Sequence, residues 1–196
     1  MRENDSQSAS FSFDIFFPYL VHLTVTSFIK SISAFQLKHL HLSSTTHQMK
    51  SVLDNSIREE LIQRIHSLTP QHTAQWGKMN VHQMLEHCAR CDDMYLGELH
   101  IRRVLIGRLI GRMFKNKILK KDLPFGKSSP TAQILMIAET NGNMDQQKES
   151  WLKRIEQYGN YNNNKFIHPF FGPMTKEEVG VFAYKHADHH LRQFGA

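Results

Sequence analysis

The sequence contains little cysteine and no hydrophobic run long enough to cross a membrane. Its only cysteines, Cys88 and Cys91, are too few for the disulfide framework of a small secreted scaffold, which favours a reducing, cytoplasmic location. The apolar run 15–29 covers 15 residues and includes Pro18, whereas a membrane-spanning helix needs about 20 apolar residues. Glycine and proline are present at ordinary levels, which excludes a collagen-like or wholly disordered chain. With these classes excluded, the sequence indicates a globular domain.

The first 48 residues differ from the rest of the chain. They contain no Gly and no Trp, and their charges cancel, so the net charge of +6 belongs to residues 49–196. They also lack the positive leader and small-residue cleavage site of a secretory signal. Because Met49 directly precedes a well-patterned helix, we expect translation to begin there. The sequence therefore predicts an N-terminal extension over 1–48, either upstream sequence or disordered, and a helical domain over 49–196.

Apolar residues recur at spacings of three and four along most of residues 49–196, which predicts helices. The expected helices cover 55–68, 80–95, 101–119 and 144–158, and a last one follows Thr175. Capping boxes mark two of the starts, where Asn80 precedes Gln83 and Thr175 precedes Glu178. The run 134–137 is the only stretch resembling a short strand, and we interpret it as loop. The expected fold is an all-α antiparallel helical bundle.

The third predicted helix, 101–119, is both amphipathic and basic. Gly107 and Gly111 lie four residues apart, where a neighbouring element could approach closely. Its cations raise nucleic acid or an anionic membrane as partners, but no nucleic-acid motif or aromatic stacking platform accompanies them. We therefore expect an anionic small-molecule substrate or plain solubility, with no nucleic acid and no membrane, and we leave homodimerisation open. The apolar residues expected in the core are Val104, Leu105, Leu109, Ile110, Met113 and Phe114.

Thirteen histidines are the anomaly of the composition. At 100° per residue, His186 and His190 lie on either side of the centre of the last helix's apolar stripe, while Asp188 points outward. Histidines at i and i+4 project from adjacent turns and can bind one metal ion. His87 of the second predicted helix also faces the core. Burying three imidazoles without partners would cost about 1–3 kcal/mol each, so the pattern predicts a metal site, with the flanking His189 as an alternative ligand.

Several segments together resemble the DinB and YfiT-like helical bundles over about residues 57–196, and within them a subgroup of domains of unknown function. The resemblance implies an antiparallel four-helix bundle with a three-histidine divalent metal site between its second and last helices. It assigns His87, His186 and His190 as the ligands. The segments are Trp76-Gly77-Lys78-Met79, Gln83-Met84-Leu85-Glu86-His87, Pro124-Phe125, Ser129-Pro130-Thr131, His168-Pro169-Phe170-Phe171-Gly172 and the run YKHADHHLRQFG at 184–195.

Three neutral imidazoles leave coordination positions open, as in catalytic zinc sites, where the pKa of bound water falls to about 7. We expect zinc or nickel, and activation of water for hydrolysis. The resemblance also implies thiol-dependent transferases, in which a low-molecular-weight thiol is activated instead. No general base is evident, and Tyr95, Gln193 and His168 are the candidates to support the ligands. His168 either lines the mouth of a pocket or stacks against Phe170 and Phe171.

Two further interpretations concern residues beside these histidines. Cys88 and Cys91 lie two turns inside their helix, which indicates core packing rather than a redox motif, and ligation by Cys88 is the lesser alternative. Glu86 and Asp92 are expected to flank the apolar stripe. The alternative to an enzyme is a non-catalytic bundle, in which the ion ties two helices together and the basic face binds a partner.

Overall fold

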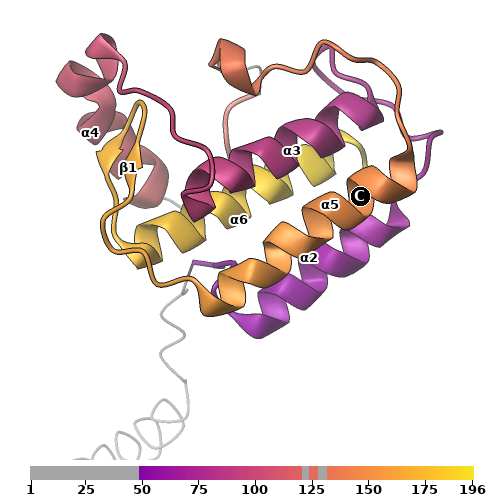
Figure 1. Cartoon of the computed structure of the whole chain (residues 1–196), viewed down its shortest axis with the longest axis horizontal. Helices are drawn as coiled ribbons and strands as arrows, with labels where there is room; N and C mark the ends of the chain where they lie inside the picture. The colour runs from indigo at the N-terminus through magenta and orange to yellow at the C-terminus, as the bar shows by residue number, and fades with distance from the viewer. Residues whose placement is uncertain (1–48, 121–123, 128–131) are drawn as a thin grey trace, which may run out of the picture. The chain divides into compact units, whose positions relative to one another are not determined.

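Helices α2 (Asn55–Ser67), α3 (Val81–Leu96), α5 (Met144–Gln157) and α6 (Lys176–Gln193) pack around a shared core (Figure 1). The computed structural model describes residues 49–120, 124–127 and 132–196. α3 contacts α5 and α6, and α2 contacts the same two helices. The predictions for residues 1–48 and for Ser129-Pro130-Thr131 lie outside the described residues. The expectation of a mostly helical protein is confirmed.

The helix starts follow the capping chemistry of the sequence. The Asn80 side chain accepts a hydrogen bond from the Gln83 backbone N–H, and the Gln83 side chain accepts one from Asn80 in return. Thr175 and Glu178 make the same reciprocal pair at the start of α6. Each pair satisfies backbone donors that a helix start leaves free, so both predicted capping boxes are confirmed.

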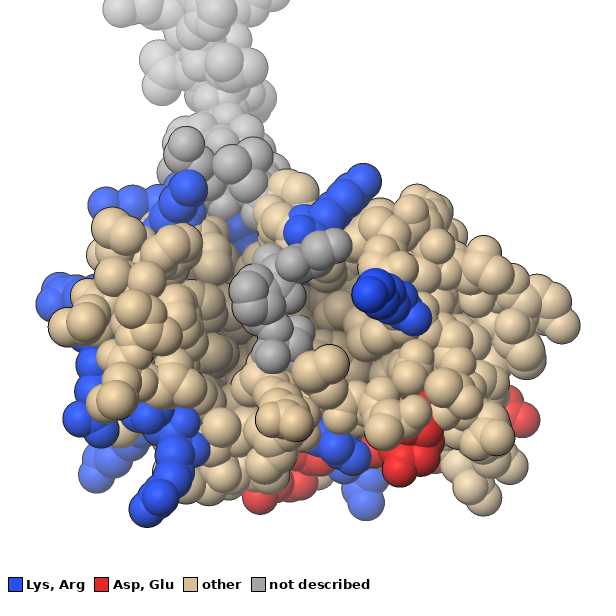
Figure 2. All heavy atoms as spheres, turned by 90° about the horizontal axis from the view of Figure 1, so that it is seen from above, with Lys and Arg blue, Asp and Glu red and all other residues tan. Residues whose placement is uncertain are grey.

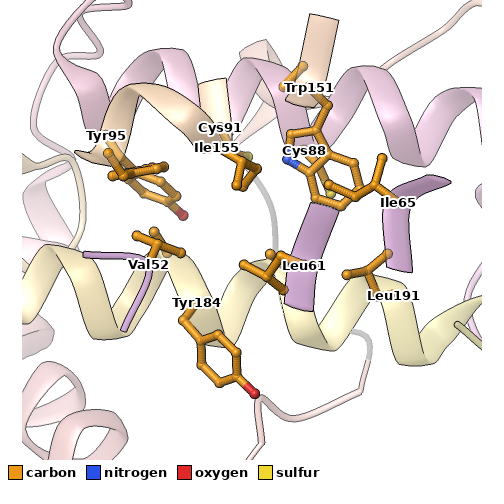
Figure 3. Packing of buried hydrophobic residues seen from close by; sticks show 14 of the residues in the cluster. Val52, Leu61, Ile65, Cys88, Cys91, Tyr95, Trp151, Ile155, Tyr184 and Leu191 are labelled. Atoms are coloured by element: carbon orange, nitrogen blue, oxygen red, sulfur yellow. The ribbon is translucent and has the colours of Figure 1, made fainter. Parts of the chain in front are cut away.

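The core lies where the inner faces of these four helices meet (Figure 3). Trp151 of α5 and Leu61 and Ile65 of α2 are completely buried. Leu191 of α6 and Cys88 of α3 are buried beside them. Burial of apolar side chains on this scale is the main force that holds the helices together.

Helix α4 (Leu105–Lys120) departs from its prediction. It begins at Leu105 instead of residue 101, and residues 101–104 have no helical structure. The Val104 N–H donates its hydrogen bond to the Pro169 carbonyl. Its apolar side chains were expected inside, but Leu105, Leu109 and Met113 are 77, 82 and 63 % exposed. Val104 and Phe114 are exposed too, and Ile110 is partly buried. The expected burial of this helix's apolar face is therefore wrong.

The inner face of α4 is made by glycine. Gly107 and Gly111 are buried, and a Cβ atom on either would overlap the Phe170 carbonyl oxygen. Phe170 lies in a hairpin formed by β1 (Ile167–His168) and β2 (Gly172–Pro173), whose strands pair antiparallel with His168 opposite Gly172. Close approach at the two glycines is thus confirmed, and backbone supplies the contact.

Short elements complete the fold. The run 134–137, interpreted as loop, includes part of a 3-10 turn, η1 (Gln133–Leu135), and α5 continues into η2 (Tyr158–Asn160). The hairpin of β1 and β2 was not predicted, because two-residue strands are too short to show an alternating pattern. Gly172 adopts a φ of +82°, which favours glycine at this turn.

Candidate metal centre

Three histidines from two helices come together beside the core. α3 supplies His87, and α6 supplies His186 and His190 one turn apart on one face. One potential ligand atom from each lies within 4.8 Å of the other two. The ring centroids are 5.2 Å apart for His87 and His186, 4.9 Å for His87 and His190, and 4.7 Å for His186 and His190. This cluster is compatible with a site for one metal ion.

Hydrogen bonds orient two of the three rings. Nδ1 of His87 lies 2.8 Å from the Leu135 carbonyl oxygen, and Nδ1 of His190 lies 2.8 Å from Oε1 of Gln193. Both oxygens can only accept, so each Nδ1 carries the proton and each Nε2 keeps its lone pair. Gln193 in turn donates through Nε2 to the Trp76 carbonyl oxygen at 2.6 Å. Metal-binding histidines characteristically donate their second ring N–H in this way.

The surroundings keep the imidazoles neutral. His87 and His190 are buried and His186 is partly exposed. Burial lowers the pKa of all three rings, and the neighbouring imidazoles lower those of His186 and His190 further, with His190 reaching about 3. Metal binding requires deprotonated ligands, and these rings already meet that condition near pH 7.

Gln193, Tyr95 and His168, which were predicted to support the ligands, differ in how they lie relative to the three cluster histidines. Gln193 is buried and contacts His190 directly, as described. The Tyr95 ring lies edge-on to His186 at 6.0 Å and to Phe182 at 5.7 Å. His168 stacks nearly parallel to Tyr95 at 6.2 Å and lies 4.5 Å from Phe171, measured between ring centroids. Tyr95 therefore lies between a cluster histidine and the hairpin.

The structure favours the stacking role of His168. Its Nδ1 accepts hydrogen bonds from the backbone N–H groups of Phe170 and Phe171, so it closes the turn of the hairpin. Burial and the nearby Arg103 lower the pKa of His168 to about 3. A neutral ring that accepts two backbone hydrogen bonds fixes the hairpin, which holds Phe170 against α4.

His189 is buried but faces different neighbours. The centroid of its ring lies 5.5 Å from that of Trp76, and the His189 side chain makes a hydrogen bond with the backbone of Phe125. Within the described residues, the group whose ligand atoms converge contains His190 rather than His189. His189 therefore joins segment 124–127 and Trp76 to α6.

Both cysteines are buried and free, which agrees with their expected packing in the core. Cys91 Sγ lies 3.7 Å from Nε2 of His87, whereas Cys88 Sγ contacts the sulfur of Met84. Burial raises the pKa of both thiols well above the ordinary value. Cys91 is thus the cysteine beside a cluster histidine, whereas the lesser alternative of the sequence analysis was ligation by Cys88.

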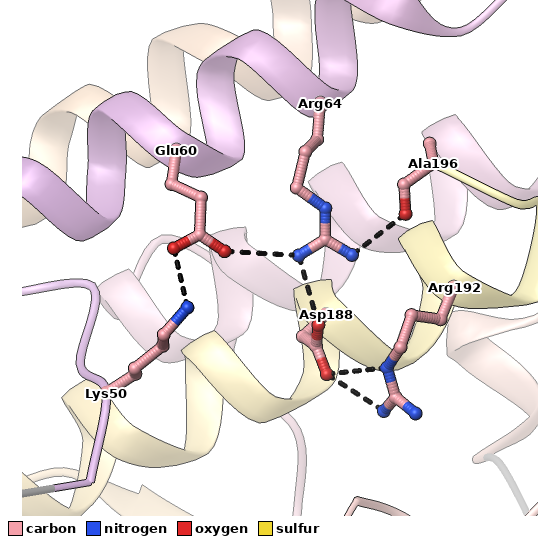
Figure 4. Close-up of polar contacts among 6 residues, drawn as sticks. All are labelled: Lys50, Glu60, Arg64, Asp188, Arg192 and Ala196. Atoms are coloured by element: carbon pink, nitrogen blue, oxygen red, sulfur yellow. Dashed lines mark hydrogen bonds and ion pairs between the residues drawn. The ribbon is translucent and has the colours of Figure 1, made fainter.

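Two carboxylates, those of Asp188 and Asp92, make contacts between helices that the sequence did not predict. Asp188, expected to point outward, faces α2 and pairs with Arg64 at 3.0 Å and Arg192 at 2.8 Å (Figure 4). Asp92, expected at the edge of the stripe, is buried, where it accepts hydrogen bonds from Trp151 Nε1 at 2.9 Å and the Tyr158 hydroxyl at 2.7 Å. Burial raises the pKa of Asp92 to about 7. Both carboxylates are used in joining helices.

Comparison with known protein families matches residues 54–194 to the DinB superfamily. The chain belongs to the DinB superfamily. The matched region contains the entire helical core and all three cluster histidines. Neither the curated proteins nor the solved structures give a match to the chain. Among the described helices, none combines the length and apolar character that a membrane span requires.

Proposed function

We propose that this DinB superfamily protein is a divalent-metal-dependent enzyme with His87, His186 and His190 as the metal ligands. The proposal rests on one observation, the convergence of three neutral imidazoles from α3 and α6 within 4.8 Å. An all-imidazole donor set suits zinc and nickel. In this proposal the helical core is an antiparallel four-helix bundle, and the metal lies between α3 and α6.

A bound ion with open positions would lower the pKa of a water or thiol ligand and supply a nucleophile at neutral pH. The protein's own contribution is positional. The Leu135 carbonyl and the Gln193 side chain fix the Nδ1 protons of His87 and His190, so that Nε2 of each ring is the ligand atom. The proposed substrate is a small molecule, with an anion favoured by the basic domain, and the proposed nucleophile is water or a low-molecular-weight thiol. A cytoplasmic location suits the two free cysteines.

Metal analysis of the untagged protein tests the ligand set. Wild type is expected to retain close to one zinc or nickel ion per chain, and His190→Ala less than about a tenth of that, because two histidines hold an ion poorly. His189→Ala is the matched control, since it removes an adjacent buried histidine outside the convergent group. Equal metal content in wild type and His190→Ala, with circular dichroism confirming folding, would refute the proposal.

A thermal shift series separates the two nucleophiles. A thiol that binds the metal-loaded protein at about 100 times its Kd stabilises the folded state by about 2.7 kcal/mol. A rise in melting temperature with a low-molecular-weight thiol, absent from His190→Ala, supports thiol transfer. No shift with any thiol favours hydrolysis or a structural ion.

The second candidate function is a non-catalytic, metal-stabilised binding module. It is favoured by the position of the cluster, because ligands from α3 and α6 would tie two core helices together as a structural ion does. Cys91, 3.7 Å from Nε2 of His87, is the closest cysteine available as a fourth protein ligand. Loss of metal in Cys91→Ser would indicate a closed four-ligand site and favour this role, whereas unchanged metal content favours the enzyme.

A further inference from the structure

The outward face of α4 is apolar over most of the helix. Leu105, Ile106, Leu109 and Met113 are all more than half exposed. At 100° per residue these four side chains fall within an arc about 100° wide, on the side of the helix opposite Gly107. A contiguous apolar face of this kind on a surface helix marks an interaction site.

The anchoring of α4 fixes this orientation. Its inner face lies so close to the hairpin that the Phe170 backbone occupies the space of a Cβ at Gly107 and Gly111. At the rim of the same contact, Lys115 pairs with Glu178 of α6 at 2.6 Å. Turning the apolar residues inward would place Leu105 and Leu109 where only glycine fits. The exposure therefore follows from how the helix is held.

Exposed cations surround the apolar face. No Asp or Glu occurs from residue 99 to residue 120. Figure 2 shows Lys and Arg side chains gathered at the end of the molecule where α4 lies, with Asp and Glu toward the middle and the other end. The exposed basic residues of this region are Arg102, Arg108, Arg112, Lys117 and Lys120.

This charge pattern selects the occupant of the face. A second copy of the chain would bring five further cations against the same five, with no acidic residue in α4 to neutralise either set. An anionic surface instead attracts all of them. Apolar side chains bordered by long basic ones are the pattern of helices that lie in the plane of an anionic membrane, with the basic heads reaching the headgroups.

We propose that α4 is a peripheral membrane-binding helix that docks on anionic phospholipid. Leu105, Leu109 and Met113 enter the boundary between headgroups and acyl chains, and Arg108 and Arg112 pair with lipid phosphates. The sequence predicted no membrane partner and, separately, placed these apolar residues in the core, but their exposure gives α4 an apolar surface that a membrane could bind. The proposal is independent of the metal centre.

Sedimentation of the full chain with lipid vesicles tests the proposal. The protein is expected to bind vesicles of equal parts phosphatidylcholine and phosphatidylserine, and to bind pure phosphatidylcholine at least about tenfold more weakly, since each Lys or Arg near an anionic surface contributes about fivefold. Raising the ionic strength to about 1 M, where the screening length is about 3 Å, is expected to release most of the bound protein.

Two matched pairs of variants assign the binding to α4. Met113→Ser is expected to weaken vesicle binding at least about threefold, whereas Met136→Ser, at 62 % exposure against 63 % for Met113, leaves it unchanged. Lys120→Gln is expected to weaken it about fivefold and Lys153→Gln, an exposed lysine of α5, to leave it unchanged. All four substitutions are at exposed positions, and their metal content is expected to equal that of wild type.

Three results would overturn the proposal. The first is absence of binding to the anionic vesicles, and the second is equal loss of binding within either matched pair. The third is a dimer in light scattering that Leu109→Glu dissociates, in a protein that does not bind vesicles, because the face would then join two copies. Metal content measured on the same samples keeps these outcomes separate from failure of the metal site.

Discussion

Helices α3 and α4 are both 16 residues long and both amphipathic, yet they present their apolar faces in opposite directions. α3 lies against α5 and α6, and its apolar face is buried together with His87. α4 meets the hairpin through Gly107 and Gly111 and contacts α6 through Lys115, and its apolar face points to solvent. An apolar stripe therefore marks a face that will be covered, but the covering element can belong to another molecule.

The two helices also differ in what they supply. α3 contributes a metal-binding candidate whose orientation depends on its rigid surroundings, the Leu135 carbonyl and the core. α4 contributes a surface whose contacts lie outside the core, so its outward side chains are free to vary without unfolding the protein. The candidate metal centre thus lies within the packed helices, at α3 and α6, whereas the proposed surface recognition lies outside them, at α4.

Substituting one leucine in each helix gives the largest expected difference. Leu85 of α3 is fully buried, and Leu85→Ala is expected to lower the free energy of unfolding by about 2–5 kcal/mol, because it leaves a cavity. Leu109→Ala in α4 is expected to change it by less than about 0.5 kcal/mol. Urea unfolding of both variants measures the contrast. Similar losses in the two variants would mean that α4 is packed like α3.

Local patterns predicted the parts of the structure that depend on local geometry. Asn80 with Gln83 and Thr175 with Glu178 form caps because each pair needs only residues three apart. The spacing of His186 and His190 likewise follows from the rise of one turn. That His87 meets them was inferred from its place on the apolar face of α3, and the convergence of the three ligand atoms agrees with it.

The parts of the structure that were not predicted depend on which element packs against a given helix face. A helical wheel shows the faces of one helix and not the elements that pack against them. The wheel placed Asp188 correctly away from the apolar stripe, but α2 with Arg64 lies on that side. The partner of His87 is a backbone carbonyl, that of Leu135, which any residue type could supply. For α4 a usable signal was present, because Gly107 and Gly111 lie opposite the apolar arc and show which side is packed closely.

Gly111→Ala tests the anchoring of α4. In an open helix this change stabilises by about 1 kcal/mol, because alanine has the higher helix propensity. Here the added Cβ overlaps the Phe170 carbonyl oxygen and comes within 2.9 Å of its carbon, and such overpacking costs about 1–3 kcal/mol. We expect a net loss of unfolding free energy in urea, with Asn116→Ala on the exposed face as the control. A stabilised Gly111→Ala would show that the hairpin yields and does not fix α4.

The pH dependence of stability that Asp92 produces is the smallest effect that we expect, and it concerns the buried face of α3. Its pKa is about 7 in the folded protein against 3.8 when unperturbed, so the unfolded chain releases the proton at lower pH. The stabilising contribution of the protonated carboxyl is therefore complete below pH 3.8 and is lost as the pH rises through about 7. Between pH 6 and pH 8 the free energy of unfolding of the wild type is expected to fall by on the order of 1 kcal/mol relative to that of Asp92→Asn, whose side chain does not titrate.

Urea unfolding of both proteins at several pH values measures this difference, and only its change with pH is informative. Asp92→Asn also alters the hydrogen bonds from Trp151 and Tyr158, but that cost is independent of pH and cancels in the comparison. Parallel curves for the two proteins would mean that these donors, together with the nearby Arg154, stabilise the carboxylate enough to offset its burial. The buried face of α3 would then carry a charged Asp92 at neutral pH. The difference between α3 and the solvent-facing α4 would in that case be one of packing alone.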